Sequence, residues 1–169
     1  MRLPVEDLTA EAFSPFGRVI DRPGRDRDAA GPGWSWWAET QVLEGDGRSW
    51  AVGYLDLQPA DLRFDWAERH LRSPEAIVPL GAGCLVYVGP SDDLDRPAEL
   101  PPFDRFRVFR VPPGAGVLMD RGVWHGAPFA DAAPGAAIVL LLEGTPRDDV
   151  TKVGFEDTPV EIDATTPEG

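Results

Sequence analysis

The chain has 169 residues, of which 43% are hydrophobic and 27% charged, and its formal net charge is −13. This composition is typical of a folded domain with a substantial core. The length is sufficient for one such domain and short for two domains. An acidic surface of this kind repels phosphate groups, so we expect neither nucleic acid nor a membrane as a partner. We predict one domain over residues 1–156 and an acidic, partly disordered tail over 157–169.

The 18 glycines and 18 prolines interrupt the chain too often for long helices, which favours short strands joined by turns. Cys84 is the single cysteine, so the sequence offers no internal disulfide, and we expect this residue to be buried and apolar. The first residues lack the apolar segment of a signal peptide, and no apolar run is long enough to span a membrane. The expected location is therefore the cytoplasm.

Alternating or continuous apolar runs predict a succession of strands along the chain. Thr9 is expected to cap a helical turn over 10–13 between the first two of them. The predicted strands are 3–5, 17–20, 50–57, 62–70, 76–79, 85–88, 105–111, a strand from 116, one restarting at 123, and 136–142.

Three tryptophans, Trp34, Trp36 and Trp37, follow a polar Gly/Pro loop over 22–32. They could line a binding pocket. We interpret them instead as packing in the core or at the barrel rim, which is the usual place of aromatic side chains in sheets.

The stretch 62–75 carries the first candidate site. Its alternation places Glu68 and His70 on the same side of the strand as Leu62, Phe64 and Trp66, with about 6 to 7 Å between successive side chains on that side. If the apolar residues face a core, the acid and the imidazole face it as well. Such a polar pair at the edge of an apolar interior is typical of a ligand site.

The second and last histidine, His125, follows a tight turn at Arg121 and Gly122, where a strand restarts. Both histidines are therefore expected to point inward. Neutral imidazole is the commonest metal ligand in proteins, so the pair indicates a metal site.

The pattern Glu68-x-His70-x4-Glu75, followed by Gly122-x-x-His125, resembles the two motifs of the cupin superfamily, with Glu68 where the first histidine would stand. The fold that this implies is all-β, a cupin-like jelly-roll β-barrel with one or two short helical turns. The four side chains would form a nitrogen and oxygen site for a divalent metal such as Zn, Mn, Ni or Fe.

A closer resemblance covers the chain from its N-terminus to at least Leu142. The stretches 8–20, 68–70, 76–79, 116–117 and 123–128 are similar to those of the ureidoglycolate lyases, a cupin-like family of purine and allantoin catabolism. This chain departs from the family pattern at three positions. Glu75 stands where the family generally has Gln, Asp120 where it usually has His, and Gly126 where His commonly follows Trp-His.

The resemblance implies a lyase that cleaves ureidoglycolate to glyoxylate and urea, a reaction that needs a base, an acid and a cation for the substrate carboxylate. His70 and His125, with Glu68 or Glu75, would hold the metal, and an uncoordinated carboxylate, Glu75 or Asp120, would move the proton.

For the substrate, we expect Arg72 or Arg121 to bind the carboxylate, and Trp124 is a further candidate contact, although packing is its simpler role. Arg69 is expected to face outward because it has the opposite strand parity from His70.

The sequence is also compatible with two other functions. The changes at Glu75, Asp120 and Gly126 favour a metal-dependent enzyme of the same fold that acts on another small hydroxy or keto acid. A non-catalytic module that binds a small acid would keep the pocket without a positioned base. For either enzyme, a small-molecule hydroxy-acid substrate and a homodimer are expected, because open barrels often pair their exposed edges.

Overall fold

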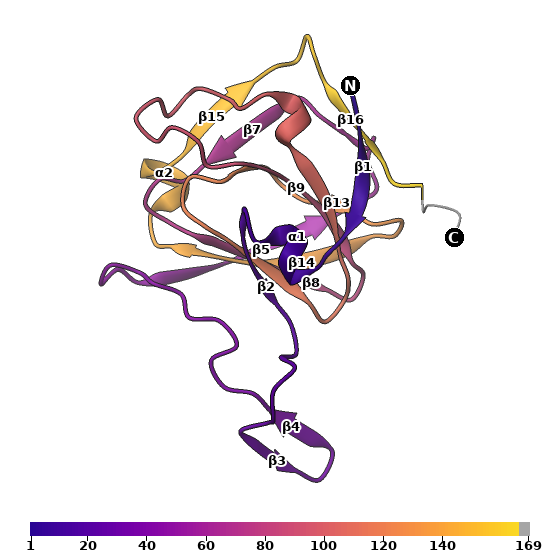
Figure 1. Ribbon diagram of the computed structural model, residues 1–169, viewed down its shortest axis with the longest axis vertical. Helices are drawn as coiled ribbons and strands as arrows, with labels where there is room; N and C mark the ends of the chain where they lie inside the picture. Colours follow the sequence, from indigo (N-terminus) through magenta and orange to yellow (C-terminus); the bar gives the residue numbers. More distant parts are fainter. Residues whose placement is uncertain (166–169) are drawn as a thin grey trace.

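The structure is a computed structural model that describes residues 1–165 (Figure 1). Residues 166–169 of the predicted tail lie outside the described residues. The elements are β1 (Arg2–Asp7), α1 (Ala10–Phe13), β2 (Gly17–Ile20), β3 (Ala29–Gly31), β4 (Trp34–Trp36), β5 (Trp50–Leu57), β6 (Arg63–Phe64), β7 (Trp66–Arg69), β8 (Glu75–Leu80), β9 (Cys84–Gly89), η1 (Phe103–Arg105), β10 (Arg107–Val111), β11 (Gly116–Met119), β12 (Trp124–His125), β13 (Phe129–Ala130), β14 (Gly135–Leu142), α2 (Thr145–Asp148), β15 (Thr151–Gly154) and β16 (Val160–Asp163).

Two sheets form the body of the molecule. The larger has the order β15-β7-β12-β9-β10-β1-β16-β6, with β13 also paired to β9, and the smaller has the order β2-β11-β8-β14-β5. They pack as a cupin-like β-barrel, which confirms the predicted all-β fold with short helical turns. Because neighbours in each sheet are mostly distant in sequence, the barrel brings the two histidine motifs together.

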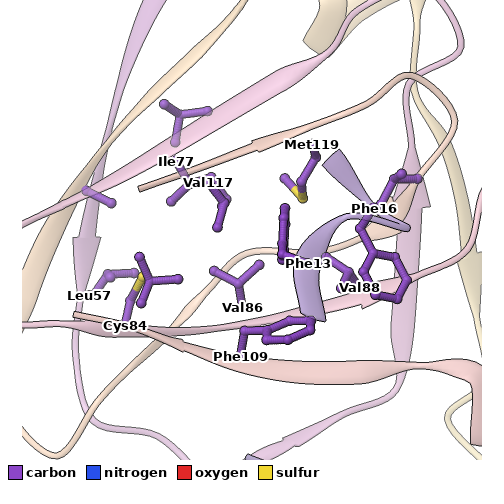
Figure 2. Packing of buried hydrophobic residues seen from close by; sticks show 14 of the residues in the cluster. Phe13, Phe16, Leu57, Ile77, Cys84, Val86, Val88, Phe109, Val117 and Met119 are labelled. Carbon is purple, nitrogen blue, oxygen red and sulfur yellow. The ribbon is translucent and has the colours of Figure 1, made fainter. Parts of the chain in front are cut away.

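The main hydrophobic core lies between the two sheets. Figure 2 shows Phe13 of α1 pointing into it beside Met119, and the Phe13 and Phe109 rings meet edge to face at 5.2 Å between centroids. The turn that carries Phe13 is capped as predicted, because the Thr9 side chain accepts a hydrogen bond from the Ala12 amide. Cys84 is fully buried in this core, and burial raises its pKa to about 12.

A second core covers the opposite face of the larger sheet. The first five residues of β9 alternate between the two cores, with Val86 in the first and Tyr87 in the second, so β9 is buried on both faces. This explains its continuous apolar run. Tyr87 stacks on Phe64 at 4.0 Å between ring centroids.

The tryptophan cluster is not part of either core, and the expectation of core or rim packing is wrong for Trp34 and Trp36. The two side chains are 54% and 58% exposed on the hairpin β3–β4, which extends away from the barrel in Figure 1. Short strands that pair only with each other bring no second layer to cover their side chains.

Part of the segment predicted as an acidic tail is an ordered strand. Residues 160–163 form β16, which pairs in parallel with β1 and antiparallel with β6. Val160 and Ile162 are buried, so this segment closes the second core rather than leaving it. Among the described residues, no helix is long and apolar enough to cross a membrane.

Candidate functional site

A pocket of about 380 Å³ lies between β5, β7 and β14. The polar side chains Glu68, His70 and Glu75 line part of it, and the other lining residues are mostly apolar. The lining residues are Gly53, Tyr54, Leu55, Trp66, Glu68, His70, Glu75, Gly126, Ala127, Pro128, Val139, Leu141, Pro146 and Val150. An apolar cavity with a few convergent polar groups is the usual form of a ligand site.

Glu68 and His70 reach this pocket because the strand over 62–70 is interrupted. The predicted strand is interrupted at Asp65, which separates β6 from β7. The interruption changes which residues point to each face of the sheet. Phe64 therefore packs in the second core, whereas Trp66 and Glu68 line the pocket. The prediction that Phe64 shares a face with Glu68 is wrong for this reason, but Trp66, Glu68 and His70 do share the pocket.

His125 comes from β12, where it pairs directly with Glu68 across the two strands. The His70 and His125 rings lie 5.0 Å apart between centroids, and both side chains are almost fully buried. The ligand atoms of Glu68, His70 and His125 all lie within 4.8 Å of one another, a group that could hold a metal ion.

Glu75, the first residue of β8, sits between the two imidazoles. Its Oε2 atom lies 3.1 Å from Nε2 of His70 and 3.3 Å from Nε2 of His125. Burial raises the pKa of this carboxyl group, but the attraction of His125 and His70 outweighs burial and lowers it to about 2. Burial lowers the pKa of His125, and the Glu75 carboxylate outweighs that effect and raises it.

Both imidazoles are oriented by backbone carbonyl groups. Nδ1 of His70 lies 2.8 Å from the Asp149 carbonyl oxygen, and Nδ1 of His125 lies 2.9 Å from that of Val123. Because a carbonyl oxygen only accepts, each Nδ1 carries a hydrogen, and the neutral ring has its lone pair on Nε2. When a ring is protonated, Nε2 also carries a hydrogen and donates it to the Glu75 carboxylate, the state that the raised pKa of His125 favours. When the rings are neutral, the same Nε2 lone pairs and the carboxylate oxygen are available to a divalent cation.

Asp149 also holds the turn between His70 and Glu75. Its buried carboxylate accepts hydrogen bonds from the amides of Leu71, Arg72 and Ser73 at 2.9 to 3.0 Å. One residue therefore fixes the His70 ring through its carbonyl group and the backbone that leads to Glu75 through its side chain.

The other sequence-predicted site residues lie away from the pocket. Asp120 and Arg121 line a separate surface pocket, where they pair with Arg18 and Asp46 at 3.3 and 2.9 Å. Arg72 is half exposed and pairs with Asp148 outside the barrel. Trp124 is fully buried in the second core, on the opposite side of β12 from His125.

Arg69 does not face solvent, which corrects the expectation from strand parity. It does leave the barrel interior, but the loop over 90–100 covers it completely. Its guanidinium group donates to the carbonyl oxygens of Asp92, Asp93, Arg96 and Pro97 at 3.0 to 3.1 Å and stacks on Trp124 at 4.8 Å from the ring centroid. Arg69 therefore anchors that loop to the strand that carries Glu68.

The structure adds Lys152 to the surroundings of the pocket. It is on β15 directly opposite Glu68, and its Nζ atom lies 3.7 Å from the centroid of the Trp66 ring. Directly opposed residues of two paired strands point to the same side of the sheet. The only sequence signal for this residue was that it is the single lysine of the chain.

The structure explains why residue 126 is a glycine. A Cβ atom at this position would lie 1.7 Å from the Tyr87 hydroxyl oxygen, which donates a hydrogen bond to the Trp66 carbonyl group. The Tyr87 side chain therefore occupies the space that a larger residue at 126 would need.

The barrel is mostly antiparallel, and one histidine and two carboxylates line its pocket, with the second histidine at hydrogen-bond distance from one of them. This arrangement defines the chain as a cupin-like protein with a group of side chains that could hold a metal ion. The model of the family described as ureidoglycolate lyase matches residues 1–163 of this chain. The chain belongs to the ureidoglycolate lyase family.

Individual relatives agree with this assignment. A ureidoglycolate lyase of Rhodobacter capsulatus is 37% identical over 145 residues, which cover 82% of this chain and 85% of the relative. One of Azotobacter vinelandii is 33% identical over 73% of this chain and 74% of its own length. One of Brucella anthropi is 28% identical over 98% and 96%, respectively.

Proposed function

We propose that the chain cleaves ureidoglycolate to glyoxylate and urea. The observation that carries the proposal is a largely apolar pocket lined by Glu68, His70 and Glu75, with His125 directly behind it at 3.3 Å from Glu75, within a chain that belongs to the ureidoglycolate lyase family. The reaction breaks the bond between the central carbon and a urea nitrogen. The hydroxyl proton leaves as the new carbonyl group forms, and the urea nitrogen receives a proton.

In this proposal His70, His125 and Glu75 hold a divalent cation of the Zn, Mn, Ni or Fe type. The two Nε2 atoms face one carboxylate oxygen at 3.1 and 3.3 Å, and a carboxyl group with a pKa of about 2 is a persistent anion, which suits a ligand better than a base. When bound, such a cation would act as a Lewis acid towards the hydroxy-acid group.

Glu68 is the proposed proton carrier. It is half-buried, lines the pocket and lies near both histidines, so its carboxylate can take the substrate hydroxyl proton and return one to the urea nitrogen. It replaces Asp120 in this role, because Asp120 pairs with Arg18 in another surface pocket.

Lys152 is the proposed contact of the substrate carboxylate. Its ammonium group lies over the ring of Trp66, which lines the pocket, whereas Arg72 and Arg121 pair with acids elsewhere. Lysine binds carboxylates as a compact point charge, and the aromatic ring below it limits its range of positions.

The assay measures glyoxylate release from racemic ureidoglycolate together with the metal content of the protein. We expect His125→Ala to lose both the metal and the activity, and Glu68→Gln to keep the metal and lose the activity. Loss of metal from Glu68→Gln would make Glu68 a ligand instead. A folded, metal-loaded wild-type protein without glyoxylate release would overturn ureidoglycolate as the substrate and favour another small hydroxy or keto acid.

We further propose that the enzyme is a homodimer. The support is the exposed edge of the smaller sheet at β5. The cytoplasmic location stays a prediction from the sequence.

A further inference from the structure

Strand β5 is an unprotected edge. It ends the smaller sheet, and among the described strands it pairs only with β14. Residues 51–54 are exposed on both faces, and Val52 and Tyr54 are 70% and 68% exposed. Proteins usually cover or charge such an edge, because its free amide and carbonyl groups can pair with another strand.

The apolar character of β5 continues on the outer face of the sheet. Val52 lies opposite Leu140 and Tyr54 opposite Ile138, and both partners are only half-buried. Leu80 of β8 adds a further 42% exposed side chain on this face. Neighbouring exposed apolar residues of this kind mark interaction surfaces.

The same chain carries a second exposed apolar feature. Residues 22–38, which we call the arm, include the hairpin β3–β4 and extend away from the barrel in Figure 1. Trp34 and Trp36 are more than half exposed at its end. Tryptophan is among the residues that contribute most to protein interfaces.

The charge of the arm differs in sign from that of the body. The arm contains three arginines and two aspartates, a net charge of +1, which leaves −14 on the rest of the chain. Two copies of so acidic a body repel each other unless the contact excludes the acids. An arm of opposite charge, laid on residues 50–55 of β5, which carry no charge, meets that condition.

We propose that the arm of one copy lies along β5 of a second copy, with Trp34 and Trp36 covering Val52 and Tyr54. A two-fold axis makes this contact twice, once for each arm. Because Gly53, Tyr54 and Leu55 of β5 line the pocket, each arm also covers one side of the partner's pocket mouth. This last part rests on the proposed function, whereas the contact itself does not.

The association is tested first by sedimentation velocity on the full chain and on Val52→Glu, Trp36→Glu and Leu94→Glu. Leu94 is 51% exposed on another loop and serves as the matched control. We expect the wild type and the control to sediment at twice the monomer mass of 18.4 kDa, and the other two variants to sediment as monomers. A monomeric wild type, or a dimer that survives both substitutions, would overturn the proposal.

The geometry of the contact is tested by interchain disulfide formation. A chain with Trp36→Cys is mixed with a tagged chain that carries Val52→Cys, under mild oxidation; the native Cys84 is fully buried and does not compete. We expect a mixed disulfide dimer, and none when Leu94→Cys replaces Val52→Cys. Cross-linking only within a chain that carries both cysteines would instead place the arm on its own β5 and contradict the exchange.

The covering of the pocket is tested by the activity of the monomeric variants. We expect Val52→Glu and Trp36→Glu to lose about tenfold in kcat/KM for ureidoglycolate, equivalent to about 1.4 kcal/mol, relative to Leu94→Glu. A monomer with full kcat/KM would refute the covering of the pocket. If the wild type is inactive while the mass and disulfide results hold, the proposed function fails and the arm contact stands.

Discussion

Asp149 and His70 are joined by a 2.8 Å hydrogen bond between the backbone carbonyl oxygen of one and Nδ1 of the other. The bond fixes the ring so that Nε2 faces Glu75, and the Asp149 carboxylate holds the three amides that follow His70 in the chain. Groups that orient metal ligands in this way commonly contribute 10- to 100-fold to metal affinity.

The first prediction concerns Asp149→Asn. An amide can no longer accept from all three backbone N–H groups, so the turn between the proposed ligands loosens and the affinity for a divalent cation falls by roughly 10- to 100-fold. Isothermal titration calorimetry with Zn or Mn measures this change. Asp148→Asn, at the exposed neighbouring position, should bind the cation as the wild type does. Unchanged affinity in folded Asp149→Asn would contradict the role.

The second prediction concerns acid stability in the presence of a chelator. The folded-state pKa of Glu75 is about 2, below its ordinary value of 4.5. This carboxylate therefore stabilises the fold above pH 4.5, and the contribution is lost as the pH falls from 4.5 towards 2. Urea unfolding across this interval should show a steeper loss for the wild type than for Glu75→Gln. Glu11→Gln, on the exposed side of α1, should follow the wild type, and parallel curves for Glu75→Gln would refute the assignment.

The third prediction concerns Lys152→Met. Removal of the ammonium group takes away the proposed charge-assisted contact with the substrate carboxylate, so KM should rise by about tenfold or more while kcat changes little. Steady-state kinetics of glyoxylate release measure both constants. Arg63→Met removes an exposed cation from β6 and should leave KM unchanged. A fall in kcat alone would show that Lys152 acts in the chemical step instead.

The fourth prediction concerns Arg69→Met. The substitution removes the four hydrogen bonds that the fully buried guanidinium group donates to carbonyl groups of the loop over 90–100, and the free energy of unfolding should fall by about 2 kcal/mol or more. Urea denaturation measures the loss. Arg105→Gln removes an exposed ion pair with Asp92 of the same loop and should cost about 1 kcal/mol or less. Equal losses in the two variants would show that the Arg69 contacts contribute little.

The sequence by itself determined the local structure and the inward direction of the key side chains. Hydrophobic periodicity located most strands, Thr9 marked the start of α1, and both histidines were expected to point into the barrel. These features depend on residues a few positions apart, whose relative directions the backbone geometry fixes.

Only the tertiary structure decided which distant residues meet. Strand pairing places His125 opposite Glu68, and the start of β8 places Glu75 between the imidazoles. Periodicity predicted that Arg69 leaves the barrel interior but not that a loop covers it, and nothing local pairs Lys152 with Glu68. Register between strands far apart in the sequence depends on the packing of the whole barrel, so no single stretch of the chain contains it.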